Sequence, residues 1–404
     1  FAATRRMEDI RPLDPATASA QIVASEFHRR FVQPCRVFRA PGRVNLIGEH
    51  TDYNDGFVMP AALGFCTYVA AAALGGRTLT VHSLDFNETV ALDLDALPPG
   101  ATGHWSDYVR GVAAVLQARG LTIVGASLAI KGDVPIGAGL SSSAAVEVAT
   151  AFALLAVSGV SLDRRVIAEI CQRAEHEYAG TKCGIMDQFI SCLGQASQAL
   201  LLDCRSLQYD PLPVPDGVRI VICNSMVKHA LAGGEYNLRR ADCEAGIQVL
   251  RRHFPGIQAL RDVTASQLQQ YSAEMPERIY RRCRHVVSEN ARTLAAAAEL
   301  RGGDVARFGS LMYESHASLR DDYAVSCSEL DLLVELARKC AGVFGARMTG
   351  GGFGGCTVNL VEANVVEAFQ AEVARRYENA TGKRPAIYVC AASPGAGEVG
   401  VQSA

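Results

Sequence analysis

The segment from residue 43 to residue 55, RVNLIGEHTDYND, gathers Arg43, Glu49, His50, Asp52 and Asp55 in an otherwise apolar stretch. Arg43 is a permanent cation that can balance phosphoryl charge. Carboxylates and an imidazole in a dense set suit a polyol, whose neighbouring hydroxyls they can hydrogen-bond. The alternative is a salt-bridged surface turn, because runs of charge usually face solvent.

A glycine-rich turn at residues 132–159, GDVPIGAGLSSSAAVEVATAFALLAVSG, lies between a predicted strand and a long predicted helix. Gly137 and Gly139 let the backbone approach a ligand, and Leu140 leads into Ser141 to Ser143, which supply hydroxyls and a helix cap. The helix N-terminus attracts anions. The pattern is neither a P-loop nor a Rossmann fingerprint, so we expect a different phosphate loop. An ordinary capped helix start is the alternative.

Two further carboxylates lie in predicted helices. Ile167, Cys171 and Glu175 recur at helical spacing, which puts Glu175 on an apolar stripe, where Mg²⁺ shared with a loop serine would satisfy it. His176 and Glu177 fall on other faces, where we expect solvated surface. We therefore treat Glu175 as the candidate metal ligand of this helix.

Asp187 follows Gly184 at the start of a short apolar helix, CGIMDQFISCLG. The helix N-terminus favours the ionised carboxylate, which can accept a hydrogen bond from a substrate hydroxyl. Simple helix capping is the alternative.

A second glycine cluster, MTGGGFGGCTV at residues 348–358, surrounds Phe353. So many glycines are unfavourable inside a strand, which suggests that the backbone passes close to a ligand or to the other glycine loop. A flexible surface turn is the alternative.

Hydrophobic periodicity indicates mixed strands and helices in the first half and mainly helices in the second. A strand at 34–48 should run into a Pro-Gly turn, and strands at 66–74 and 79–86 should form a hairpin. Three prolines at 210–217 place a domain boundary there, giving domains 1–212 and 213–404. The other expected elements are helices at 16–31, 106–120, 235–254, 288–319 and 328–340, and strands at 90–97, 126–136, 344–361 and 384–392.

The composition is that of a globular protein. The 404 residues are long for one hydrophobic core, and 49% are hydrophobic with a mean hydropathy of +0.11. A net charge of -3 argues against nucleic-acid or anionic-membrane partners, and no apolar run is long enough to span a bilayer. The 13 dispersed cysteines are expected to be free thiols of a cytoplasmic protein.

Five ordered motifs between residues 37 and 358 resemble the GHMP superfamily of small-molecule kinases. PGRVNLIGEHTDYNDG is similar to the signature of the galactokinase family, and the chain looks close to its animal type. PIGAGLSSSAA resembles the superfamily's phosphate loop and MTGGGFGGCTV its third motif, while CGIMDQFIS and GGEYNLRR are also typical of the family. The resemblance implies an α+β fold of two domains with the active site in the cleft between them.

The same resemblance implies transfer of the ATP γ-phosphoryl group to the C1 hydroxyl of galactose. Asp187 matches the catalytic aspartate, and Arg43 matches the arginine that stabilises it and the transferring group. Residues 137, 139, 140 and 141–143 match the ATP phosphate loop, and Ser142 with Glu175 would bind Mg²⁺. The sugar-binding positions implied are Arg43, Glu49, His50, Asp52, Gly184, Asp187, Tyr236 and Gly351 or Gly352.

Two other functions stay open at this point. A non-catalytic sensor of galactose and ATP would share the scaffold, although the phosphate loop here is complete. A kinase acting on N-acetylgalactosamine would share the loop and differ in the sugar pocket. We expect a cytoplasmic monomer or weak homo-oligomer whose partners are the small-molecule substrates.

Overall fold

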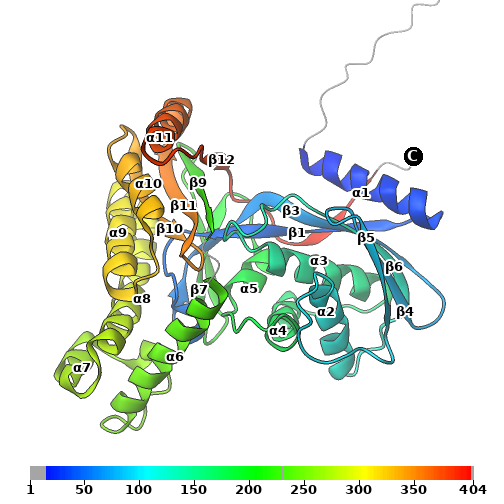
Figure 1. The fold of residues 1–404 in the computed structure, drawn as a ribbon, viewed down its shortest axis with the longest axis horizontal. Helices are drawn as coiled ribbons and strands as arrows, with labels where there is room; N and C mark the ends of the chain where they lie inside the picture. Colours follow the sequence, from blue (N-terminus) through cyan, green and yellow to red (C-terminus); the bar gives the residue numbers. More distant parts are fainter. Residues whose placement is uncertain (1–14, 229–231, 402–404) are drawn as a thin grey trace, which may run out of the picture.

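The computed structural model describes residues 15–228 and 232–401, with two large sheets side by side (Figure 1). The first sheet has six strands in the order β13-β1-β3-β6-β4-β5, antiparallel except for the parallel pair β4 and β6. Its strands are β1 Arg36–Asn45, β3 Pro60–Ala73, β4 Thr78–Ser83, β5 Glu88–Asp93, β6 Ala126–Gly132 and β13 Gly397–Val399.

Helices cover both faces of this sheet because its strands are apolar on both sides. One helix lies on one face, where Phe27 packs against Val37 and Tyr68. On the other face, the helix Ser142–Val157 is apolar on almost all sides, which explains why it is deeply buried. These helices are α1 Pro15–Phe31 on the first face and α2 Asp107–Ala118, α3 Ser142–Val157, α4 Arg164–Ala174 and α5 Met186–Leu193 on the second.

The second sheet has the order β10-β11-β9-β12, with all pairs antiparallel. Alternation along β9 sends Val221 towards α10 and α11, and Ile220 and Ile222 towards α8 and α9. Its strands are β9 Val218–Lys228, β10 Val343–Thr349, β11 Gly354–Glu362 and β12 Ala386–Cys390. The helices of this half are α6 Ala232–Arg251, α7 Ala265–Gln270, α8 Glu277–Gly302, α9 Val305–Ser318, α10 Ser328–Arg338 and α11 Val366–Thr381.

A small third sheet joins the two halves. Its strands are ordered β2-β7-β8, and the core beneath it mixes Leu46 and Met59 of the first half with Phe308 of the second. The strands are β2 Phe57–Val58, β7 Gln198–Asp203 and β8 Tyr209–Pro213. The short turns of helix are η1 Asp52–Asn54, η2 Glu175–Ala179, η3 Leu260–Asp262, η4 Ser272–Glu274, η5 Leu319–Tyr323 and η6 Ala363–Val365.

The α+β class is confirmed, and most expected helices and strands form within a few residues of their predicted bounds. The helix expected at 288–319 is two helices, α8, which begins earlier, and α9, and the strand expected at 344–361 is two strands, β10 and β11, separated by the second glycine cluster. Two further local predictions were wrong. The strands at 66–74 and 79–86 do not form a hairpin, because β6 lies between β3 and β4. The expected Pro-Gly turn is a bulge inside β1, where the pairing with β3 shifts between Pro41 and Arg43.

The proposed division at residues 212 and 213 stays a prediction. β8 ends at the predicted boundary, but β13 returns to the first sheet and pairs with β1. All thirteen cysteines are free, as expected, and each is at least half-buried. Within the described residues, no helix is both long and apolar enough to cross a membrane.

Candidate active site

One cavity of about 270 Å³ collects most of the residues that the sequence singled out from distant parts of the chain. Asp55 of the charged segment does not line it and instead pairs with Arg205 at the surface. Of the predicted site residues, Gly184 and Gly352 do not line it. The predicted residues that line it are Arg43, Glu49, His50, Asp52, Gly137, Gly139, Leu140, Ser141, Ser142, Ser143, Glu175, Asp187, Tyr236 and Gly351.

The Asp187 carboxylate lies in the first turn of α5 and is held by a cation and a hydroxyl. Arg43 donates from Nε to Oδ1 at 2.8 Å and from Nη2 to Oδ2 at 2.9 Å. Ser141 donates its hydroxyl to Oδ2. Both oxygens of the Asp187 carboxylate are therefore paired with side chains from outside α5, which rules out helix capping as its main contact.

The phosphate loop and the second glycine cluster pack backbone against backbone. Gly350, at φ +84°, would place a Cβ 2.8 Å from the carbonyl oxygen of Gly139, and Gly355 would place one 3.1 Å from that of Ala138. The expected close approach of the two glycine loops is thus confirmed. Arg43, in the β1 bulge, hydrogen-bonds the phosphate loop. Its backbone N–H donates to the carbonyl oxygen of Leu140, and its Nη1 donates to that of Gly139.

Ser141 does not cap α3 as expected. It occupies the N-cap position with φ 62°, but its hydroxyl binds Asp187 instead of a backbone N–H. The first turn of α3 therefore keeps its N–H groups free of a side-chain cap, which suits an incoming anion.

Glu175 lies where α4 changes to a single π-helical turn, η2, a feature that often occurs at functional sites. Its Oε2 accepts hydrogen bonds from Gln188 Nε2 at 2.6 Å and Cys183 Sγ at 3.5 Å, and the Ser143 hydroxyl also bonds the carboxylate. Burial, with the nearby negative charge of Asp187, raises the pKa of Glu175 to about 7.

A buried carboxylate that sequence reasoning missed stands behind Glu175. Glu147 on α3 is fully buried and accepts the second hydrogen bond of Gln188 Nε2, at 3.0 Å. Burial raises its pKa well above the usual range, so it is held as the neutral acid. Its signal in the sequence was a lone charge inside an apolar helix.

Asp52 stands at the N-terminus of η1 and packs against Gly184. A Cβ at Gly184 would fall 2.0 Å from Asp52 Oδ2, so the glycine makes room for this carboxylate and lies behind it. Burial, followed by the charge of Asp187, raises the pKa of Asp52 to about 7. Gly352 backs onto the carbonyl of Val325 rather than onto the cavity.

Aromatic rings close one side of the cavity around His50. The His50 ring centroid lies 5.6 Å from that of Tyr236 and 4.8 Å from that of Tyr323. Nδ1 hydrogen-bonds the Tyr53 hydroxyl at 2.8 Å, and burial lowers the pKa of the imidazole well below its usual value. His50 Nε2 has no hydrogen-bond partner of good geometry among the described residues. The backbone of Gly351 lies near it and acts to raise the pKa of the imidazole, but burial outweighs this effect.

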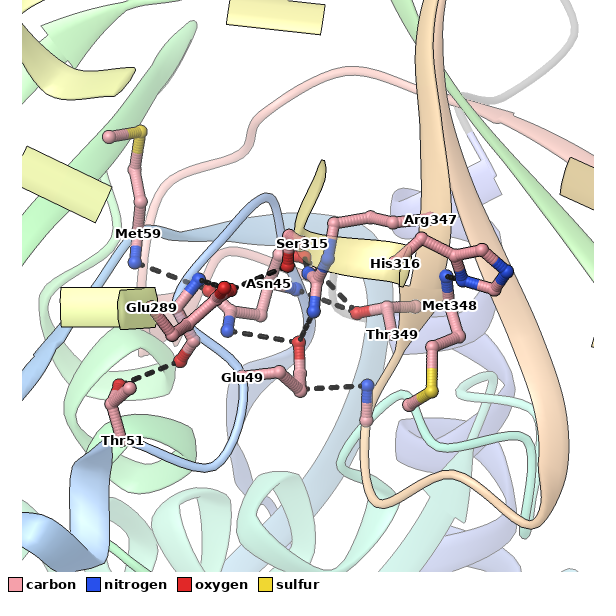
Figure 2. A network of polar contacts seen from close by, with 12 residues as sticks. Asn45, Glu49, Thr51, Met59, Glu289, Ser315, His316, Arg347, Met348 and Thr349 are labelled. Atoms are coloured by element: carbon pink, nitrogen blue, oxygen red, sulfur yellow. Dashed lines mark hydrogen bonds and ion pairs between the residues drawn. The ribbon is translucent and has the colours of Figure 1, made fainter. Parts of the chain in front are cut away.

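Glu49 is held by residues of the second half (Figure 2). Arg347 Nη2 donates to Glu49 Oε2 at 2.6 Å, and the Gly350 N–H donates to Oε1 at 2.8 Å. The Glu49 side chain is 3% exposed and that of Arg347 is 0% exposed. Sequence reasoning missed Arg347, because nothing local predicts a partner 298 positions away.

A second cavity of about 150 Å³ adjoins the first and shares Ser142 and Ser143 with it. It is mainly apolar, and Phe86 stacks on Trp105 at its side with ring centroids 6.0 Å apart. The only tryptophan of the chain was a signal that sequence reasoning did not use.

The neighbours of Glu175 on η2 divide between surface and interior. Glu177 pairs with Arg173 in solvent, as expected. His176 is half-buried and bonds the Cys183 carbonyl at 2.7 Å, so its assignment to the solvated surface was wrong. No group of three or more His, Cys, Asp or Glu side chains within the described ranges forms a metal cage.

Three family models match this chain. The galactokinase galactose-binding signature covers residues 25–73, the GHMP kinases N terminal domain covers residues 107–195, and the GHMP kinases C terminal model covers residues 295–379. The first two contain the residues that pair in the cavity, Arg43 and Asp187.

Whole-length comparisons agree with the family models. A galactokinase from Chloroflexus aggregans is 52% identical over 92% of this chain and 96% of its own, and one from Roseiflexus is 48% identical over 93% and 97%. The crystal structure of Lactococcus lactis galactokinase complexed with galactose has a TM-score of 0.90 and 36% identity, covering 94% of this chain and 99% of that one.

More distant structures share the fold alone. A mevalonate kinase is 17% identical with a TM-score of 0.59, covering 88% of this chain and 98% of that one. With the galactokinase signature on the strand of Arg43 and relatives about half identical over nearly their whole length, the chain belongs to the galactokinase family of the GHMP kinases.

Proposed function

We propose that the protein is an ATP-dependent sugar kinase that transfers the γ-phosphoryl group of ATP to the C1 hydroxyl of galactose, giving galactose 1-phosphate and ADP. The observation that carries this proposal is the Arg43–Asp187 pair, which lies in a cavity bordered by two glycine loops. The printed names of the relatives and the complex with galactose support the choice of sugar.

Asp187 would accept the hydrogen bond of the C1 hydroxyl and take its proton as the phosphoryl group arrives. Phosphoryl transfer passes through a loose transition state, so positioning and charge neutralisation matter more than a strong base. The two hydrogen bonds from Arg43 fix the carboxylate plane, and the guanidinium charge would also stabilise the transferring group. Ser141 holds Oδ2 from the other side.

ATP would place its phosphates against the loop of Gly137, Gly139 and residues 140–143, at the N-terminus of α3. The uncapped N–H groups there favour negative charge. The adjoining cavity is mainly apolar and is lined by Phe86 and Trp105, so it suits the flat base of ATP. It shares Ser142 and Ser143 with the phosphate site, which places the base next to the phosphates.

The residues around Glu175 fit Mg²⁺. This ion takes few protein ligands and completes its shell with phosphate oxygens and water, so the absence of a three-ligand cage among the described residues is compatible with it. Glu175, with a hydroxyl from Ser142 or Ser143, would hold the ion. Bound there, Mg²⁺ would neutralise charge that develops on the phosphates.

The sugar would lie between the charged segment and Tyr236. We assign hydroxyl contacts to Glu49, His50, Asp52 and Gly351, as the family resemblance implies. We further propose a cytoplasmic location, in keeping with the free cysteines, and a monomer or weak homo-oligomer. Closeness to the animal type stays a prediction, since the relatives named above are bacterial.

The test is magnesium-dependent ADP release with galactose, N-acetylgalactosamine, glucose or no sugar. We expect turnover on galactose alone, and a fall in kcat of at least roughly 100-fold in Asp187→Asn, because general-base groups contribute 10²–10⁴-fold. Asp216→Asn, an exposed aspartate, is the matched control.

Each other outcome selects a different function. Saturable binding of galactose and ATP without ADP release would identify a sensor. Turnover on N-acetylgalactosamine in place of galactose would identify the other kinase. Wild-type turnover in Asp187→Asn with unchanged sugar affinity would refute the role of that carboxylate.

A further inference from the structure

The network in Figure 2 holds the segment from residue 45 to residue 51 from the side of the second half. Gly48 donates its N–H to Glu289 Oε1 at 3.0 Å, and His285 Nε2 lies 3.1 Å from the carbonyl oxygen of Glu49. These contacts fix the backbone of the segment. They leave the orientation of the Glu49 carboxylate to other groups.

Arg347 supplies that orientation. It extends from β10, is fully buried, and donates from Nη2 to Glu49 Oε2 at 2.6 Å and from Nη1 to the carbonyl oxygen of Asn45 at 2.8 Å. Asn45 Nδ2 adds a second donor to Oε2 at 3.1 Å. One carboxylate oxygen is therefore saturated by donors that are themselves anchored.

The other oxygen keeps accepting capacity. Among the described residues, Glu49 Oε1 accepts a single hydrogen bond, from the Gly350 N–H at 2.8 Å, although a carboxylate oxygen can accept two. Glu49 lines the cavity beside Arg43 and His50. The remaining lone pair of Oε1 is thus the one available to a ligand hydroxyl.

The positive charge of Arg347 also keeps Glu49 an acceptor. Burial raises the pKa of the Glu49 carboxyl, and Arg347 is the largest of the influences that lower it. Without that charge, burial would favour the protonated form, which donates a hydrogen bond from one oxygen.

We propose that Arg347 is a positioning residue that sets sugar selectivity: by saturating Oε2 of Glu49, it presents Oε1 as the acceptor for one sugar hydroxyl. The proposal rests on the galactose kinase function above. Arg347 itself need not contact the sugar, because it does not line the cavity and its Nη1 and Nη2 donate to Asn45 and Glu49.

The experiment measures kcat/KM on galactose and on its 2-, 3-, 4- and 6-deoxy analogues, which all keep the C1 hydroxyl, for the wild type and for Arg347→Met. For one member of the series, we expect the wild type to lose roughly 100-fold against galactose, because the buried acceptor is left unpaired. In Arg347→Met that ratio should shrink to within about 5-fold, while the ratios for the other deoxy sugars and the KM for ATP stay near wild type.

Arg282→Met is the matched control, since Arg282 is a buried arginine of the same half that does not contact Glu49. It should lose stability without changing any sugar ratio. Arg347→Lys keeps a charge that can reach Oε2, so it should recover part of the selectivity for the same deoxy sugar.

If Arg347→Met does not fold, the same measurement is made on Glu49→Gln and Arg347→Lys. Both variants must then change the kcat/KM ratio for the same deoxy sugar. A uniform loss on every sugar in the Arg347 variants would assign Arg347 a merely structural role and overturn the proposal. A wild type that does not phosphorylate galactose would instead refute the proposed function.

Discussion

At the scale of single residues, the carboxylates around the cavity differ in what compensates their charge. Asp187 and Glu49 each face a buried arginine, whereas Asp52 has a backbone N–H and Glu175 has an amide, a thiol and a hydroxyl. Burial, with the nearby charge of Asp187, raises the pKa of Asp52 and of Glu175 to about 7, so these two carboxylates hold a proton at mildly acidic pH.

The pKa of Asp52, raised to about 7, makes the stability of the metal-free protein depend on pH. Below its ordinary pKa of 3.8, Asp52 is protonated in both the folded and the unfolded protein. Between about pH 4 and 7, Asp52 keeps its proton only in the folded protein. The stabilisation is therefore lost as the pH rises through about 7. We expect Tm to fall less between pH 5.5 and 8 in Asp52→Asn than in the wild type.

Differential scanning calorimetry without ligands checks this expectation. Glu175 contributes in the same direction, and comparing variant with wild type cancels that contribution. Parallel Tm curves for the two proteins would show that Asp52 titrates near its ordinary value.

Residue types and local order were enough to predict the members of the site, but not their partners. The charged segment and Asp187 were recognised from their own neighbourhoods. Arg347 and Glu147 were not, because a buried charge is explained only by the residues that surround it in space.

At the scale of elements, the site depends on two glycine loops that touch through their backbones. At this contact, backbone atoms of one loop face backbone atoms of the other, so no side chain can be shortened to make room for a larger residue. The separation of the phosphate loop from the Thr349–Gly350 turn is thus set by the absence of Cβ atoms.

Gly350→Ala should disturb both loops. Its φ of +84° is unfavourable for alanine, and the new Cβ would lie 2.8 Å from the Gly139 carbonyl oxygen. We expect the KM for ATP to rise roughly 10-fold, the equivalent of about 1.4 kcal/mol. Gly217→Ala, with open space around its Cβ, is the control, and steady-state kinetics that cannot tell the two variants apart would disprove the backbone contact.

Element types were predicted well because periodicity is local, whereas strand neighbours were not. The segments at 66–74 and 79–86 are close in sequence, yet β6 inserts between them and pairs with both. The Ser141 cap failed for a similar reason, since Asp187 offers its hydroxyl a charged acceptor from another helix.

At the scale of the whole molecule, the residues around β13 join the far end of the sequence to the helix of Asp187. Gly395 and Ala396 donate their N–H groups to the carbonyls of Gly194 and Ser191, each at 2.7 Å. Arg164 binds the carbonyls of Ala396 and Cys192. The last turn of α5 is thereby supported by residues just before β13, which lie far along the sequence from it.

Deleting the residues after Ser393 should weaken this support. At about 1 kcal/mol for each lost hydrogen bond, we expect Tm to fall by roughly 5 °C and kcat to fall as α5 loosens. Glu398→Gln, which removes only the exposed pair with Arg36, should cost less than about 1 kcal/mol. Thermal unfolding and kinetics that match the wild type would exclude a supporting role for this segment.

The pairing of β13 with β1 also has a consequence for synthesis on the ribosome. β1 is synthesised long before β13, so the first sheet has an open edge beside β1 until β13 has been made. That edge is a template for pairing with other nascent chains. We expect the growing polypeptide to need chaperone protection until residues 397–399 have left the exit tunnel.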